Sequence, residues 1–171
     1  METKKETITL ISKDELYRTQ LKANFLAKGY HLLDFSDVEE ARSALQNQQV
    51  DLILFDSSSQ NVPEFNSAQD PQNATVAQKK IPLIIISNGT GEKAIEAFKA
   101  GADDFITKNE LFDISLSRVQ MHLNAKKIER DLELQRLRAI TSAKMVSLGE
   151  LAGGAAHEIN NPLSIAFAHL N

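Results

Sequence analysis

The sequence contains no cysteine and no tryptophan, and it has only four prolines and seven glycines among its 171 residues. Without cysteine there is no disulfide, no thiolate metal site and no cysteine nucleophile, which fits a reducing compartment. No apolar run approaches the roughly 20 residues that cross a bilayer, and the N-terminal METKKETITL lacks the apolar segment of a signal peptide. The net charge of −4 is not the basic surplus of a nucleic-acid-binding surface. We therefore expect a cytoplasmic protein that binds neither nucleic acid nor membrane.

What the sequence does contain is a regular alternation of apolar runs and amphipathic stretches. Hydrophobic residues make up 42% of the chain and charged residues 25%, which is ordinary for a globular protein and excludes disorder as the main state. Short β-type runs occur at 7–11, 31–35, 50–55, 82–86 and 104–107, with helical patterns between them. The third and fourth runs are apolar on both faces, as in central strands of a parallel sheet. The pattern predicts an α/β fold with a five-stranded, doubly wound parallel sheet.

Local signals predict where the helices begin and end. The stretch from Ser36 to Glu39 resembles a capping box, and Gly29 and Gly101 stand where a helix C-terminus needs glycine. The first helix carries apolar residues at helical spacing, including Leu16 and Phe25. The segment 57–80 holds two of the four prolines and interrupts the alternation, so a short or irregular helix is expected there.

From about residue 111 onward helix-forming residues dominate, and no proline occurs until Pro162. Apolar residues recur at steps of three or four, as in a helix–helix seam, with a slip in register near Leu134 to Leu137. A helix of this length would extend about 90 Å at 1.5 Å per residue, too long to stay bare as a monomer. We expect a long C-terminal coiled-coil helix and a parallel homodimer formed through it. The seam residues are Met121, Ile128, Leu132, Leu137, Leu148, Ala152, Ala155, Ile159, Leu163, Ala166 and Leu170.

Three of the predicted strands end in polar residues, namely Asp56, Ser87 and Lys108. Ligands of a doubly wound sheet bind at the carboxyl ends of the strands, so these three side chains are expected to converge. A carboxylate nucleophile with a hydroxyl and an ammonium beside it would form a phosphoryl-acceptor site. Taken singly, each residue is more often a turn, a cap or a solvated side chain. Their joint occurrence favours the functional interpretation.

The strings DLILFD, IPLIIIS and GADDFITK resemble the three conserved strands of response-regulator receiver domains, which have a flavodoxin-like fold. The resemblance implies that residues 1–124 form a receiver-like domain, with Asp56 in the phosphoacceptor position, Ser87 as the switch hydroxyl and Lys108 as the family lysine. Receivers also carry an acidic pair that holds Mg²⁺, but Ser12 and Lys13 stand in its place here. Because Mg²⁺ prefers carboxylate oxygens, we expect a degenerate receiver with no metal site. We expect Lys13, together with Lys108, to pair with Asp56, and Asp14 to cap the following helix.

A second motif lies near the end of the chain, in the string His-Glu-Ile-Asn-Asn-Pro-Leu. Helical geometry turns His157 about 200° from the seam, so its ring is expected to face solvent with Asn161 one turn further on. The string resembles the phosphoacceptor box of sensor histidine kinases. The resemblance implies that His157 carries the phosphoryl group, Glu158 acts as acid and base, and Asn161 positions water for the phosphatase reaction. Residues 125–147 would then be a signalling helix, and residues 148–171 a truncated phosphoacceptor helix.

Together these features predict the regulatory N-terminal part of a histidine kinase in a two-component phosphorelay. No cofactor is expected in this stretch of chain; ATP and Mg²⁺ would belong to a catalytic domain that is missing from it, so it should be inactive alone. The expected partners are a second copy and a cognate response regulator. Two alternatives stay open: an interaction module without phosphoryl chemistry, and a hybrid kinase whose Asp56 is functional.

Overall fold

In a computed structural model the chain forms two units, residues 1–125 and residues 126–171, which are described separately. The structure describes residues 5–58, 81–89 and 91–168, without the side chains of 43–47, 150 and 155–168. The expected short helix within 57–80 therefore lies almost wholly outside the described residues. The strands are β1 (Thr7–Ile11), β2 (His31–Phe35), β3 (Leu52–Asp56), β4 (Leu83–Ser87) and β5 (Asp104–Thr107). The helices are α1 (Glu15–Ala27), α2 (Val38–Asn47), α3 (Gly91–Lys99) and α4 (Phe112–Ala168).

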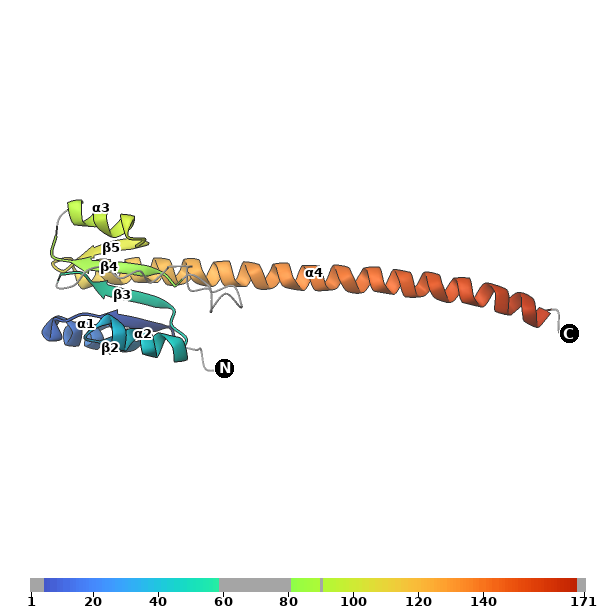
Figure 1. The fold of residues 1–171 in the computed structure, drawn as a ribbon, viewed down its shortest axis with the longest axis horizontal. Helices are drawn as coiled ribbons and strands as arrows, with labels where there is room; N and C mark the ends of the chain where they lie inside the picture. Colours follow the sequence, from blue (N-terminus) through green and yellow to red (C-terminus); the bar gives the residue numbers. More distant parts are fainter. Residues whose placement is uncertain (1–4, 59–80, 90, 169–171) are drawn as a thin grey trace. The chain divides into compact units, whose positions relative to one another are not determined.

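The five strands form one parallel sheet in the order β2-β1-β3-β4-β5 (Figure 1). All four pairings are parallel, with Leu10 opposite Asp34 on one side and Leu54 on the other. Strands β3 and β4 are buried at every position, as expected for central strands. The strand order reverses between β1 and β3, and the sequence-based prediction of a doubly wound sheet is confirmed.

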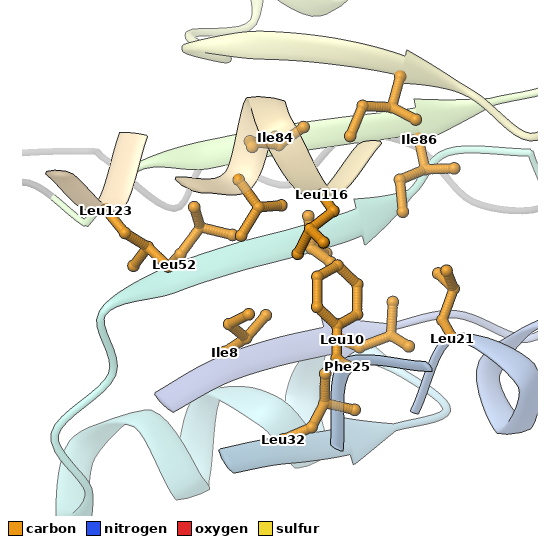
Figure 2. Packing of buried hydrophobic residues seen from close by; sticks show 13 residues of the cluster. Ile8, Leu10, Leu21, Phe25, Leu32, Leu52, Ile84, Ile86, Leu116 and Leu123 are labelled. Atoms are coloured by element: carbon orange, nitrogen blue, oxygen red, sulfur yellow. The ribbon is translucent and has the colours of Figure 1, made fainter. Parts of the chain in front are cut away.

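Each face of the sheet is covered by a hydrophobic cluster because successive strand residues point to opposite faces. On one face α1 and the first turns of α4 pack on the strands, and Figure 2 shows their side chains pointing at strand residues such as Leu10 and Leu52. The ring of Phe25 is central to this cluster and lies edge-on to Phe112, at 5.1 Å between centroids. Ala41 of α2 and Ala97 of α3 belong to the cluster on the other face.

The helix ends follow local chemistry, with one correction to the sequence-based assignment. Gly29 and Gly101 have φ values of 90° and 95°, which few other residues adopt, and each stands two residues after the end of a helix. The start of α2 is capped by Asp37, whose Oδ1 accepts from the backbone N–H of Glu40 at 2.9 Å. The cap is therefore one residue later than the box beginning at Ser36, because Asp37 rather than Ser36 reaches the free N–H groups.

Some apolar residues at helical spacing are more exposed than the sequence pattern predicts. Leu16 of α1 is 81% exposed and Ile95 of α3 is 57% exposed, although both match helical spacing. Helix α4 is a single element of 57 residues, so the long C-terminal helix is confirmed. Within the described ranges no helix combines the length and the apolar character that a membrane span requires.

Candidate functional site

The candidate site lies at the carboxyl end of β3, the middle strand of the sheet. Asp56 is the last residue of this strand, where its backbone pairs with Ile86 of β4. Every residue of β3 is buried, and the Asp56 side chain has no exposed surface. A carboxylate in such a place must be compensated by hydrogen bonds and opposite charge, because burial alone disfavours its ionised form.

Three groups supply that compensation. The ammonium of Lys108 lies 2.8 Å from Oδ2 of Asp56, and the hydroxyl of Ser12 donates to the same oxygen at 2.6 Å. The backbone N–H of Ser58 donates to Oδ1 at 2.9 Å. Burial raises the pKa of Asp56, but the hydrogen bonds from Lys108, Ser12 and Ser58 outweigh it and hold that pKa below its ordinary value. The carboxylate is therefore ionised at neutral pH and already paired.

Lys108 is positioned by the strand that precedes it. It follows β5, and its backbone N–H donates to the carbonyl of Ser87 at 3.0 Å, which continues the strand pairing toward the site. Its side chain is only 10% exposed and its ammonium has a second partner, Oδ2 of Asp14, at 3.1 Å. The ammonium also lies 4.6 Å from the ring centre of Tyr17. Burial lowers the pKa of Lys108, but Asp56 and Asp14 outweigh that effect and raise it.

Asp14 and Tyr17 come from the first turn of α1. Asp14 is the N-cap of this helix, as expected, and its Oδ1 accepts from the backbone N–H of Tyr17 at 3.0 Å. That bond, followed by the hydrogen bond from Lys108, lowers the pKa of Asp14. Burial, then the negative charges of Asp56, Asp14 and Glu110, raise the pKa of Tyr17 to about 12. The phenol therefore stays neutral over the physiological range.

The structure thus brings together Ser12, Asp56 and Lys108 of the residues expected from the sequence. Lys13 is exposed, and no ion pair with Asp56 is found among the described contacts, so Lys108 is the cation at this carboxylate. Ser87 is buried at the end of β4, where its hydroxyl accepts from the N–H of Gly89 at 3.2 Å. No described hydrogen bond joins it to Asp56.

The second predicted site lies on α4. His157, Glu158 and Asn161 are within the helical range, but their side chains lie outside the described residues, so their orientation stays a prediction. Two neighbours of Lys108 have no predicted role at the site. The sequence predicts Asp14 as a cap of the following helix and predicts no role for Tyr17. A capping aspartate uses one carboxylate oxygen for the helix and leaves the other free for a cation. This free oxygen is the sequence signal that could have pointed to Asp14.

The donor set around Asp56 decides what the site could hold. It consists of one buried carboxylate, one hydroxyl, one ammonium and the more exposed Asp14. In the parts of the chain that the structure describes, no group of three or more histidine or acidic side chains could hold a metal ion. The positive charge that touches Asp56 is a tethered ammonium.

A parallel sheet in this order, with a buried strand-end carboxylate paired to a lysine after β5, defines a receiver-type fold. The model of the response regulator receiver domain matches residues 8–119, and the chain belongs to that family. It therefore contains a receiver domain of two-component signal transduction.

Similar proteins agree with this assignment. The chain is 34% identical over 102 residues to the transcriptional regulatory protein RprY of Bacteroides fragilis, covering 59% of this chain and 42% of that protein. It is 31% identical over 109 residues to a gliding motility regulatory protein of Myxococcus xanthus, covering 63% and 14% respectively. The chain thus matches less than half the length of either relative. A receiver domain of an HD domain-containing protein from Pseudomonas fluorescens has the same fold, with a TM-score of 0.63 at 19% identity over 77% of this chain and 96% of that one.

Proposed function

We propose that this chain is the regulatory N-terminal part of a sensor histidine kinase in the cytoplasm, in which the receiver domain controls a phosphoacceptor helix. One observation carries the proposal: α4 belongs to both parts. Its residues Leu116, Val119 and Leu123 are buried in the core of the receiver domain, and the same helix continues through the motif that begins at His157. A change in packing at the sheet would reach the motif without crossing a linker.

In this proposal the motif supplies the phosphoryl chemistry. His157 accepts the phosphoryl group on a ring nitrogen, Glu158 takes the proton from the imidazole, and Asn161 positions water in the reverse reaction. ATP and Mg²⁺ serve a separate catalytic domain. The phosphoryl group then passes to a cognate response regulator.

The receiver domain itself acts as a pseudo-receiver in this proposal. Mg²⁺ needs near-octahedral oxygen ligation, and receivers meet this need with an acidic pair after the first strand. Here that pair is replaced by Ser12, whose hydroxyl is already donated to Asp56, and by the cation Lys13. With Lys108 in contact with Asp56, these residues do not fit a divalent cation. Phosphorylation of Asp56 should therefore be very slow.

The second unit supports a homodimer. Large apolar side chains along this part of α4 are about half to three-quarters exposed, among them Leu137 at 52% and Leu151 at 72%. A shallow groove on the helix is lined by Leu134, Leu137, Arg138, Thr141, Ser142 and Met145. A second copy packed in parallel would cover this surface as a coiled coil. Sedimentation of the chain as a monomer at high concentration would contradict this part of the proposal.

The function is tested by phosphoryl transfer in trans. The chain is incubated with the catalytic domain of a histidine kinase and radiolabelled ATP, and acid-labile phosphate is measured. We expect labelling that is lost in His157→Gln and retained in His31→Gln, a control at an exposed strand residue. Absence of acid-labile phosphate in the wild-type chain would favour the alternative of an interaction module without phosphoryl chemistry.

A separate experiment tests the pseudo-receiver. The chain is incubated with acetyl phosphate and Mg²⁺, with Asp56→Asn as the control. We expect no labelling above the control, whereas labelling at the rate of ordinary receivers would favour a hybrid kinase with a functional Asp56. The double variant Ser12→Asp with Lys13→Asp restores the acidic pair and should gain Mg²⁺ binding, measured by calorimetry.

A further inference from the structure

Asp14 uses its two carboxylate oxygens for different purposes. Its Oδ1 caps α1 by accepting from the N–H of Tyr17 at 3.0 Å, and its own N–H donates to the hydroxyl of Ser12 at 3.2 Å. Its Oδ2 accepts from Lys108, a residue 94 positions away in the sequence, at 3.1 Å. An N-cap needs only one oxygen, so the second contact has no part in starting the helix.

The ammonium of Lys108 is enclosed on several sides by these groups. It has three N–H donors, of which one points to Asp56 at 2.8 Å and one to Asp14 at 3.1 Å. The ring of Tyr17 lies on a further side at 4.6 Å. The side chain of Asp14 is 46% exposed, against 10% for Lys108 and none for Asp56. Asp14 is therefore the outermost of the three charged groups, and Lys108 lies between it and the buried carboxylate.

We propose that Asp14 is a positioning residue, which holds the Lys108 ammonium against Asp56 from the solvent side. The inference rests on the proposed role of Lys108 as the tethered counter-ion of Asp56, and it names the group that keeps this counter-ion in place. Lysine is flexible, and a single partner leaves its four-carbon stem free to swing outward. A second partner at the N-cap of α1 restrains the ammonium from a second side.

The test measures how freely Lys108 reacts in the 171-residue chain. Asp14→Asn keeps the helix cap, because asparagine caps as well as aspartate, but removes the charge that Lys108 contacts. The chain is treated briefly with an acetylating N-hydroxysuccinimide ester, and acetylation of Lys108 is quantified by mass spectrometry. We expect Lys108 to react about two- to fivefold faster in Asp14→Asn, the ratio that matches the loss of one partly exposed ion pair.

Glu15→Gln is the matched control. It removes a negative charge from the adjacent exposed residue, which has no ion pair with Lys108 among the described contacts. We expect its Lys108 acetylation rate to equal that of the wild type. Asp14→Ser, which also keeps a capping side chain, should behave as Asp14→Asn, and circular dichroism should show unchanged helix content in all three variants.

Two results would overturn the inference: an unchanged Lys108 rate in Asp14→Asn and Asp14→Ser, or an equal increase in Glu15→Gln. The first would mean that Asp14 does not restrain Lys108, and the second that only the general charge of the helix start matters. The readout needs no phosphoryl transfer. Efficient phosphorylation of Asp56 would therefore contradict the proposed pseudo-receiver. It would not decide whether Asp14 restrains Lys108, which the acetylation rate measures separately.

Discussion

Two buried aspartates in the receiver domain, Asp56 and Asp104, have different sets of partners. Asp56 ends the central strand β3, and one ammonium, that of Lys108, supplies the positive charge at its carboxylate. Asp104 begins the edge strand β5, and it contacts two side chains of α4: Arg118 at 3.0 Å and His122 at 3.2 Å. Arg118 is 40% exposed, whereas Lys108 is 10% exposed.

The two aspartates differ in how many partners hold them and in where they lie in the sheet. Asp104 joins β5 to the start of α4 near solvent, and losing one partner leaves it another. Asp56 lies where the strand order reverses, the place at which doubly wound sheets put their chemistry, and it depends on one cation. Any change that moves the ammonium of Lys108 should therefore affect the Asp56 carboxylate.

Removal of the single cation at Asp56 should destabilise the receiver domain most. Lys108→Met leaves the buried Asp56 without its charge partner and should lower the free energy of unfolding by about 3 kcal/mol, as when a buried pair loses one member. Urea denaturation followed by tyrosine fluorescence measures this, because both tyrosines, Tyr17 and Tyr30, lie in the receiver domain. Adding Asp56→Asn removes the unpaired charge and should recover more than half of the loss.

Lys22→Met provides the comparison for that measurement. Lys22 pairs with Asp34 at the surface, where its side chain is 40% exposed, and such pairs contribute less than about 1 kcal/mol. Equal losses in Lys108→Met and Lys22→Met would show that the burial of Asp56 has no energetic consequence.

The Asp56–Lys108 pair also predicts a pH range of stability. The pKa of Asp56 is lowered on folding, so its contribution is present above its unfolded value near pH 4 and is lost as pH falls through the lower folded value. The pKa of Lys108 is raised, so its contribution is present below about pH 10 and is lost as pH rises through the higher folded value. The Asp56→Asn, Lys108→Met double variant should lose less stability than the wild type at both extremes in urea denaturation. Parallel curves of stability against pH for the wild type and the double variant would contradict this prediction.

The edge-strand aspartate should tolerate the equivalent change better. Arg118→Met leaves Asp104 hydrogen-bonded to His122, and we expect a loss of about 1 kcal/mol in the same denaturation experiment. The double variant Arg118→Met with His122→Leu should lose more than the sum of the two single variants, because only then does Asp104 lose both of its side-chain partners on α4. Simple additivity would mean that the two partners act independently.

The fold was largely predictable because the signals for strands and for helix ends are both local in the chain. Continuous apolar runs specify central strands, and Gly29 and Gly101 mark helix ends whose positive φ values confirm them. The same reasoning misplaced the α2 cap by one residue and overstated burial at Leu16, since spacing alone does not say which apolar residues have a partner.

The site was only partly predictable for a different reason. Asp56 and Lys108 could be brought together from the sequence because strand ends of a parallel sheet share one edge. The expectation that Lys13 would pair with Asp56 together with Lys108 relied on sequence position. Lys13 lies just past the end of β1 and is exposed, and Lys108 is the cation found at Asp56 among the described contacts. The contact of Asp14 with Lys108 joins residues 94 positions apart, and helix periodicity carries no information about it.

Tyr17 is a further difference between the two aspartates, and we expect its effect on stability to be small. Its ring lies 4.6 Å from the ammonium that pairs with Asp56, whereas no described ring contact involves Arg118. Tyr17→Phe keeps the ring near Lys108 and should change stability little, whereas Tyr17→Leu should lose about 0.5 to 1 kcal/mol of cation–π attraction, with Tyr30 as the fluorescent reporter. Burial and the charge of Asp56 raise the pKa of Tyr17 to about 12. Absorbance titration should therefore show one tyrosine that ionises near pH 12, that disappears in Tyr17→Phe and that ionises at lower pH in Asp56→Asn. Ionisation of Tyr17 unaffected by Asp56→Asn would mean that the carboxylate of Asp56 does not act on the phenol.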